Sequence, residues 1–345
     1  MNNSDRTEIA DLGEFGLIDR LTQHIQLKNA SSKKGVGDDA AVISHETELQ
    51  TLVTTDLLLE GIHFDLTYVP IKHLGYKAAI VNFSDIYAMN GKPKQLTVSL
   101  GISKRFSVEN LETLYEGIES ACNEHGVDIV GGDTSASLTG LTISITCIGE
   151  APENTIVYRN GAQETDLICV SGDLGAAYMG LQLLEREKRI FADVRSGFKP
   201  DFSGKEYLLE RQLRPQARRD ITELLSENGI LPTSMIDISD GLSSELLHIC
   251  KQSKVGCRVY EEHIPIDYQT AVAAGDFNMN LVTAALNGGE DYELLFTVPL
   301  SMHKKIIELK GISVIGYIAN ESLGALLIAR DGTEMKLKAQ GWKSF

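Results

Sequence analysis

The first half of the chain alternates strand-like and helix-like patterns of apolar residues. Residues 141–147 alternate Leu, Ile and Cys with Thr and Ser, the period-2 pattern of a strand with one buried face. Apolar residues at helical spacing predict helices over residues 13–26, 72–89 and 108–124. Short apolar runs predict further strands over residues 49–54, 96–102 and 127–130. Strands that alternate with helices in this way are typical of an α/β domain.

The second half shows the same kinds of pattern after a change in composition. Turn-forming residues at 151–154 mark the expected boundary between a domain over residues 1–150 and another over residues 151–345. Strands are expected near residues 166–170, 234–238, 256–260, 292–298, 312–318 and 324–329, and helices near 173–188, 204–228, 240–252 and 301–309. The sequence therefore predicts a two-domain protein of the α/β class, of α+β type.

The charge balance limits the ligands that the protein can bind. The 345 residues include 48 acidic and 32 basic side chains, a net charge of −16. Nucleic acids and anionic membranes need a basic surface, so neither is expected as a partner. We find no run of 18 apolar residues and no apolar leader, and expect a cytoplasmic protein. An anionic ligand would then need a bound cation.

Aspartates recur at predicted strand ends and helix ends, beside small residues. They are Asp38, Asp39, Asp56, Asp85, Asp133, Asp237 and Asp240. Carboxylate oxygens are hard ligands that suit Mg²⁺, and loop ends can direct several of them into one cleft. The alternative is that aspartates simply favour turns and caps, and spacing alone does not decide between the two.

Known phosphate-binding motifs are largely missing from the chain. Gly35-Val36-Gly37-Asp38-Asp39 has the glycines of a phosphate-binding loop, but no Walker A motif occurs, and the protein-kinase motifs are also missing. The Gly-containing segment at 171–175 lacks dinucleotide-loop spacing, and a plain tight turn is favoured there. The sequence thus excludes the commonest kinase classes without excluding phosphoryl transfer.

Several short motifs, taken in order, resemble the thiamine-monophosphate kinase family. They are Gly37-Asp38-Asp39-Ala40-Ala41, Thr54-Thr55-Asp56, Glu60-Gly61-Ile62-His63-Phe64, Lys77-Ala78-Ala79, Asn82-Phe83-Ser84-Asp85, Ala88-Met89, Gly131-Gly132-Asp133-Thr134, Arg159-Asn160-Gly161, Leu213-Arg214-Pro215, Ile236-Asp237-Ile238-Ser239-Asp240-Gly241-Leu242 and Gly288-Gly289-Glu290-Asp291-Tyr292-Glu293-Leu294. Each motif is short, but the ordered set covers nearly the whole chain and is specific.

The resemblance implies both an architecture and a reaction. The family belongs to the aminoimidazole-ribonucleotide-synthetase superfamily, which implies an N-terminal α/β domain whose sheet pairs across a homodimer, and a C-terminal α/β domain. It implies direct transfer of the ATP γ-phosphate to thiamine monophosphate, with several Mg²⁺ ions. Such a transfer depends on positioning and charge neutralisation.

The resemblance also implies roles for individual residues. The metal ligands implied are Asp39, Thr54, Thr55, Asp56, Asp85, Asp133, Asp237 and Asp240, with the threonines using hydroxyl or backbone oxygens. The ATP contacts implied are Tyr115, Gly132, Asp133, Arg159 and Ser239, and the substrate contacts are His63, Glu290 and Trp342. No residue is assigned as a general acid or base, because the attacking phosphate oxygen is already ionised.

Simpler interpretations stay open for several of these residues. Arg159 can be a surface arginine, Ser239 a helix cap and Tyr115 a core tyrosine. Trp342 can place a cation against its ring or merely anchor the C-terminal tail. At the level of function, the alternatives are another ATP-dependent member of the superfamily, a non-catalytic nucleotide- or thiamine-phosphate-binding protein, and a metal-dependent phosphohydrolase.

Overall fold

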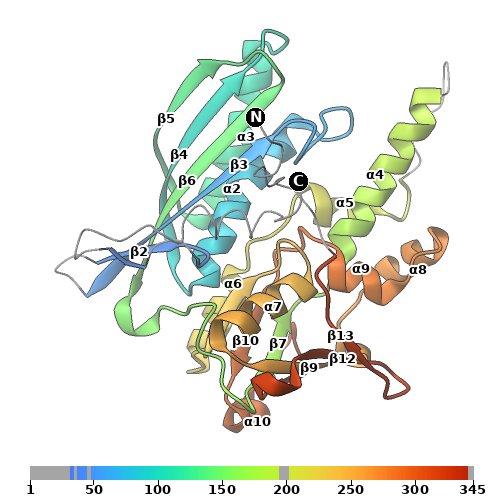
Figure 1. Ribbon diagram of the computed structural model, residues 1–345. Coiled ribbons are helices and arrows are strands. Elements are labelled where there is room, and N and C mark those ends of the chain that lie inside the picture. The colour runs from blue at the N-terminus through green and yellow to red at the C-terminus, as the bar shows by residue number, and fades with distance from the viewer. Residues whose placement is uncertain (1–31, 35–36, 45–47, 194–201, 341–345) are drawn as a thin grey trace, which may run out of the picture.

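The computed structural model of the protein describes residues 32–34, 37–44, 48–193 and 202–340 of the 345 (Figure 1). Two of the sequence predictions, the helix over residues 13–26 and the substrate contact at Trp342, lie outside these residues. Two sheets form the framework, one built from the first half of the chain and one from the second half. The mixed α/β fold class predicted from the sequence is confirmed.

The first sheet has six strands in the order β1-β2-β3-β6-β4-β5. Its strands are β1 (Ser32–Lys34), β2 (Ala41–Ser44), β3 (Leu49–Leu59), β4 (Lys92–Ile102), β5 (Asp128–Ala136) and β6 (Leu141–Pro152). β3 and β6 pair antiparallel over their whole length, from Leu49 opposite Pro152 to Leu59 opposite Thr142. β5 runs parallel to β4 at the edge of the sheet.

Two helices cover one face of this sheet, α2 (Ile71–Ala88) and α3 (Val108–His125) (Figure 1). α3 begins with a capping box, in which the side chains of Ser107 and Asn110 each accept a backbone N–H of the other residue. The alternation in β6 sends Leu141, Ile143 and Ile145 into the core against the helices. The side chains between them point to the opposite face.

The second sheet has seven strands in the order β13-β12-β9-β11-β7-β10-β8, and only β9 and β12 pair in parallel. Its strands are β7 (Leu167–Ser171), β8 (Ser234–Asp237), β9 (Gly256–Tyr260), β10 (Leu294–Val298), β11 (Ile312–Ala319), β12 (Ala325–Ile328) and β13 (Glu334–Lys336). The α-helices around it are α4 (Ala176–Asp193), α5 (Glu206–Leu213), α6 (Arg219–Glu227), α7 (Leu242–Ser253), α8 (Tyr268–Asp276), α9 (Leu281–Asn287) and α10 (His303–Ile306).

Helices pack on both faces of the second sheet. β7 shows this directly, because its alternate residues belong to different hydrophobic clusters. Ile168 and Val170 lie in the cluster that includes residues of α7 and α9, whereas Leu167 and Cys169 lie in the cluster with residues of α6 and α10. A strand buried on both faces reads as a continuous apolar run, which is why the sequence pattern here was not alternating.

The structure corrects several predicted boundaries. The strand expected over residues 127–130 continues to Ala136, because β4 also pairs with Gly131, Gly132 and the residues after them. The helix expected over residues 204–228 is two helices, α5 and α6, with Pro215 between them. Proline has no backbone N–H and disfavours a helical residue before it. α8, α9 and β13 were not predicted.

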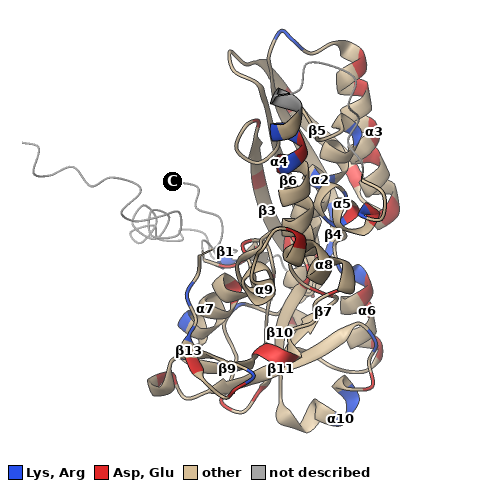
Figure 2. Cartoon of the chain, turned by 90° about the vertical axis from the view of Figure 1, so that its right-hand side faces the viewer, with Lys and Arg blue, Asp and Glu red and all other residues tan. Residues whose placement is uncertain are grey.

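The two sheets separate where β6 ends at Pro152, and α2 lies at the junction between them (Figure 1). Ala88, at the end of α2, belongs to a hydrophobic cluster made otherwise of residues from the second half. Acidic side chains lie along α3, whereas α10 carries basic side chains (Figure 2). Within the described part of the chain, no helix has both the length and the apolarity needed to span a bilayer.

Candidate active site

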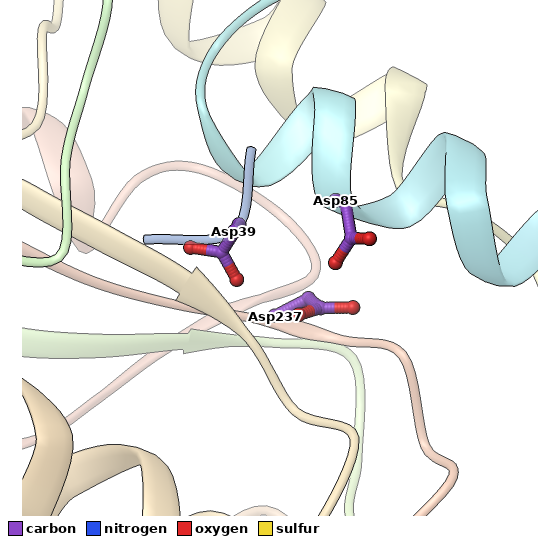
Figure 3. A group of neighbouring side chains, drawn as sticks. All are labelled: Asp39, Asp85 and Asp237. Carbon is purple, nitrogen blue, oxygen red and sulfur yellow. The ribbon is translucent and has the colours of Figure 1, made fainter. Parts of the chain in front are cut away.

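Three aspartates from distant parts of the sequence converge at this junction. One carboxylate oxygen from each of Asp39, Asp85 and Asp237 lies within 4.8 Å of the other two. Figure 3 shows Asp39 in the segment before β2, Asp85 on α2 and Asp237 at the end of β8, with their carboxylates pointing toward one another. The convergence that sequence spacing left open is thus present for these three residues, which we call the aspartate cluster.

Local structure explains how each aspartate reaches the cluster. Gly37 has a φ of +112°, a conformation that favours glycine, and it turns the chain just before Asp39 and β2. Asp85 lies in the last turn of α2, on the side that faces the second sheet. Asp237 ends β8, and Gly241, with a φ of +116°, then lets the chain turn into α7.

Neighbouring hydroxyl groups fix two of the three carboxylates. Thr54 Oγ1 donates to Asp85 Oδ2 at 2.6 Å, and Ser84 Oγ donates to Asp237 Oδ2 at 2.6 Å. Both are short hydrogen bonds to a carboxylate, the kind that is stronger than a bond between neutral groups. Thr54 therefore reaches the cluster through its side chain, and Ser84 joins it although the sequence gave it no role.

Arg159 supplies the cation that the structure places next to the cluster. Its Nε and Nη2 donate to the two oxygens of Asp39 at 2.9 and 2.7 Å, a bidentate pair. The Arg159 backbone N–H also donates to Asp38 Oδ1 at 3.3 Å. Burial lowers the pKa of the guanidinium, but the nearby Asp39 carboxylate outweighs this and raises it. Arg159 is therefore part of the site and is not a free surface arginine.

Among the described residues, Asp85 and Asp237 accept hydrogen bonds from hydroxyl groups and form no ion pair with a basic side chain. Burial, and then the charges of Asp56 and Asp237, raise the pKa of Asp85 well above its usual value. Burial and Asp39 raise the pKa of Asp237 to about 8, and burial raises that of Asp56 to about 6. Carboxylates that repel one another in this way favour a bound cation.

Asp240 lies three residues beyond Asp237, where the chain enters α7. The Asp240 backbone N–H donates at 3.1 Å to Glu245 Oε1, and Glu245 is buried. Burial, and then the charge of Asp240, raise the pKa of Glu245 well above its usual value. Glu245 was not among the residues predicted from the sequence. Its position in the first turn of a helix that follows Asp240 was the available signal.

The strand register separates Asp133 from the aspartate cluster. Asp56, Ile145, Val98 and Gly132 form one row across the first sheet, on the face that α2 and α3 cover. Asp133 is the next residue, so its side chain is on the opposite, exposed face. β5 also lies three strands from β3, roughly 14 Å at the usual strand spacing. The structure therefore does not bring Asp133 to the cluster.

Thr55 points to that same exposed face. Its Oγ1 donates to the Ile145 carbonyl at 3.0 Å and accepts from Thr146 Oγ1 at 3.1 Å. A metal contact from Thr55 would therefore have to use its backbone oxygen. Gly132 is required for close strand packing, because a Cβ at this position would lie 1.9 Å from the Val98 carbonyl oxygen.

Glu290 lies in the loop before β10 and is held from three sides. Its backbone N–H donates to the Ser239 carbonyl at 2.7 Å, so the loop is fixed to the segment that carries Asp237 and Asp240. Lys77 Nζ lies 2.8 Å from Glu290 Oε1, and Gln212 Nε2 donates to Oε2 at 2.6 Å. Ser239 thus contacts Glu290 through its backbone, whatever role its hydroxyl has.

The other predicted contacts lie in different surroundings. His63 is exposed in the turn after β3, and its Nδ1 accepts the Leu59 backbone N–H at 3.0 Å. Tyr68 follows in the same segment, and the Glu290 charge contributes to the raised pKa of Tyr68, after burial and the nearby Glu185 and Asp65. Tyr115 packs against the hydrophobic core of the first half, which fits the simpler interpretation of a core tyrosine.

The donor set of the aspartate cluster fits Mg²⁺. Three carboxylates and neighbouring hydroxyl oxygens are hard ligands, and no cysteine or histidine belongs to the group. Mg²⁺ usually takes one or two carboxylates together with water and substrate phosphates, so an acidic site at the junction of the two sheets suits it. Such a site can bring two phosphate groups together that would otherwise repel each other.

Comparison with known proteins agrees with this chemistry. Residues 37–151 match the family described as AIR synthase related protein, N-terminal domain. The chain is 33% identical to the thiamine-monophosphate kinase of Aquifex aeolicus (strain VF5), over 98% of this chain and 99% of that protein. It is 32% identical to the thiamine-monophosphate kinase of Bacillus subtilis (strain 168), over 97% of this chain and 100% of that protein.

A solved structure gives the same result for the fold. The structure described as AaThiL complexed with AMPPCP and TMP superposes with a TM-score of 0.83 at 33% identity, over 99% of this chain and 100% of that one. The similarity therefore includes both sheets and the junction that holds the aspartate cluster. The chain belongs to the thiamine-monophosphate kinase family.

Proposed function

We propose that the protein transfers the γ-phosphate of ATP to thiamine monophosphate, giving thiamine diphosphate and ADP. The observation that carries this proposal is the convergence of Asp39, Asp85 and Asp237 beside Arg159 at the junction of the two sheets. Full-length similarity to thiamine-monophosphate kinases, and to a structure described as a complex with AMPPCP and TMP, supports the choice of both substrates.

The aspartate cluster would hold Mg²⁺, and more than one ion is expected. Asp39, Asp85 and Asp237 would share one ion. Asp56, whose charge acts on Asp85, and Asp240, three residues beyond Asp237, are proposed to contribute further oxygens. Thr54 contributes by fixing Asp85, and Thr55 would use its backbone oxygen. When bound, Mg²⁺ neutralises the charge of the two phosphate groups and orients them for in-line transfer.

The protein's own groups would position the two substrates. Arg159 presents a planar guanidinium that suits the ATP phosphates. Glu290 would contact thiamine monophosphate, and His63 and Trp342 are proposed as further contacts of the same substrate. Gly132, Asp133, Ser239 and Tyr115 are proposed for ATP by resemblance. No protein base is assigned, because the acceptor phosphate oxygen is ionised at neutral pH.

The exposed face of the first sheet supports the proposal of a homodimer. It presents Thr55, Leu57 and Asp133, and the side chain of Leu57 is 53% exposed. If a second copy covers this face, Asp133 would lie at the interface between the two copies. We also propose a cytoplasmic location, because the relatives are biosynthetic enzymes.

An ADP-release assay with ATP and Mg²⁺ tests the function. ADP should appear only when thiamine monophosphate is added, not with thiamine, and thiamine diphosphate should be the second product. ADP release without any thiamine compound would instead indicate a phosphohydrolase or another superfamily activity. Nucleotide binding without turnover would support a binding protein.

A further inference from the structure

One face of α2 reaches two separate parts of the second half of the chain, the end of β8 and the loop before β10. Lys77 and Ser84 are seven residues apart, nearly two helical turns, so they lie on the same side of the helix. Ser84 donates to Asp237 in the aspartate cluster, and Lys77 pairs with Glu290. α2 also carries Asp85, so a single rigid helix sets the distance between the cluster and the Glu290 loop.

Lys77 and Gln212 together hold both oxygens of the Glu290 carboxylate. Lys77 Nζ lies 2.8 Å from Oε1 and also donates to the Gln212 carbonyl at 3.0 Å. Gln212 Nε2 donates to Oε2 at 2.6 Å. The Glu290 backbone has a φ of +66°, unusual for a residue other than glycine. Such backbone strain recurs at functional sites, where the surroundings hold the residue in place.

The burial of these three side chains differs in a way that indicates their roles. Lys77 and Gln212 are buried, at 6% and 5% exposure, whereas the Glu290 side chain is 30% exposed. Each carboxylate oxygen has two acceptor positions. Lys77 and Gln212 each occupy one position, one on each oxygen, and the partial exposure of the Glu290 side chain leaves room for a ligand to donate to the others. If Lys77 served only to stabilise the fold, its partner Glu290 would have no need to remain partly exposed.

We propose that Lys77 and Gln212 are positioning residues that fix the Glu290 carboxylate for the acceptor substrate. This inference rests on the proposed function, and it assigns a role to two residues that no comparison assigns. Because Lys77 neutralises Glu290, the carboxylate recognises its ligand by accepting hydrogen bonds from it, and the pair adds no net charge near the phosphates. α2 then keeps the acceptor in register with the aspartate cluster.

Steady-state kinetics with Lys77→Met and Gln212→Met test the proposal. Gln212→Met removes the donor to Glu290 but keeps the backbone carbonyl that Lys77 contacts, so it remains informative if Lys77→Met does not fold. Each variant should raise KM for thiamine monophosphate at least tenfold, with KM for ATP changed less than twofold. Lys77→Arg should restore part of the loss. Lys72→Met, an exposed lysine on the same helix, is the matched control and should change neither constant.

The same measurement on Glu290→Gln separates the inference from the proposed function. If Glu290→Gln raises KM for thiamine monophosphate but folded Lys77→Met and Gln212→Met do not, the positioning role is overturned and the substrate assignment stands. If Glu290→Gln has no effect, both the assignment and the positioning role fail. Equal increases in KM for both substrates would indicate a purely structural role. Calorimetric titration of thiamine monophosphate gives the same comparison as Kd if turnover is too slow to measure.

Discussion

The substitution Asp237→Asn should stabilise the protein in a metal-chelating buffer although it removes a proposed metal ligand. Burial and the charge of Asp39 raise the pKa of Asp237 from 3.8 to about 8, and one pKa unit corresponds to about 1.4 kcal/mol. At pH 8 the burial of Asp237 therefore lowers the free energy of unfolding by at most roughly 5 kcal/mol. Asparagine has nearly the same shape and can still accept from Ser84. Since the site can relax, we expect Asp237→Asn to raise the free energy of unfolding by about 2–5 kcal/mol.

The gain should depend on pH with a definite sign. The pKa of Asp237 is raised in the folded state, so folding carries no penalty below the unfolded pKa. The penalty grows as the pH rises from about 4 to about 8, where the unfolded chain has lost its proton and the folded one still keeps it. The stabilisation by Asp237→Asn should therefore be only about 1–2 kcal/mol at pH 5 and largest at pH 8.

Urea unfolding in EDTA at pH 5 and pH 8 measures this gain. The m-value should stay constant, so that the change in midpoint reports stability. Asp128→Asn, an exposed aspartate on β5, is the control and should change stability by less than about 0.5 kcal/mol. Added Mg²⁺ should stabilise the wild type more than the variant. The reasoning is refuted if Asp237→Asn is less stable than the wild type at pH 8 in EDTA, or if the gain is the same at both pH values.

Three other substitutions test the site and its framework. Arg159→Gln should lower the free energy of unfolding in EDTA by about 3 kcal/mol, because it leaves the buried Asp39 carboxylate unpaired. Added Mg²⁺ should recover part of this stability in a denaturation assay. A loss of less than about 1 kcal/mol would contradict the prediction. Gly132→Ala should destabilise by roughly 2 kcal/mol or more, because its Cβ would meet the Val98 carbonyl, whereas Gly131→Ala, with only a 4.0 Å contact, should be nearly neutral by thermal unfolding. Asp56→Asn should abolish ADP release while leaving the circular dichroism spectrum unchanged; retained activity would remove Asp56 from the metal site.

The sequence predicted most elements correctly where the local pattern and the tertiary environment agree. The alternation of β6 and the helical spacing of α3 are local signals, and the structure follows them. The predictions were wrong where pairing or backbone chemistry overrode the pattern. β5 continues through Gly131 and Gly132 because β4 provides partners there, and Pro215 divides the helix that the apolar spacing had joined.

The candidate site shows the same division. Ordered motifs identified Asp39, Asp85 and Asp237 as candidates, but alternatives such as helix caps and turns could not be excluded from spacing. The structure brings these three together and places Asp133 on the opposite face of the sheet, because a one-residue step along a strand reverses the side-chain direction.

Taken alone, the amino-acid sequence determined the fold class, the family resemblance and the types of residue available for metal and phosphate binding, because these follow from local pattern and residue identity. Only the tertiary structure decided which of these residues meet. Lys77, Gln212 and Glu290 are separated by 135 and 78 residues, and no sequence spacing indicates their contact. That contact depends on how α2 packs between the two sheets, which is a property of the folded chain as a whole.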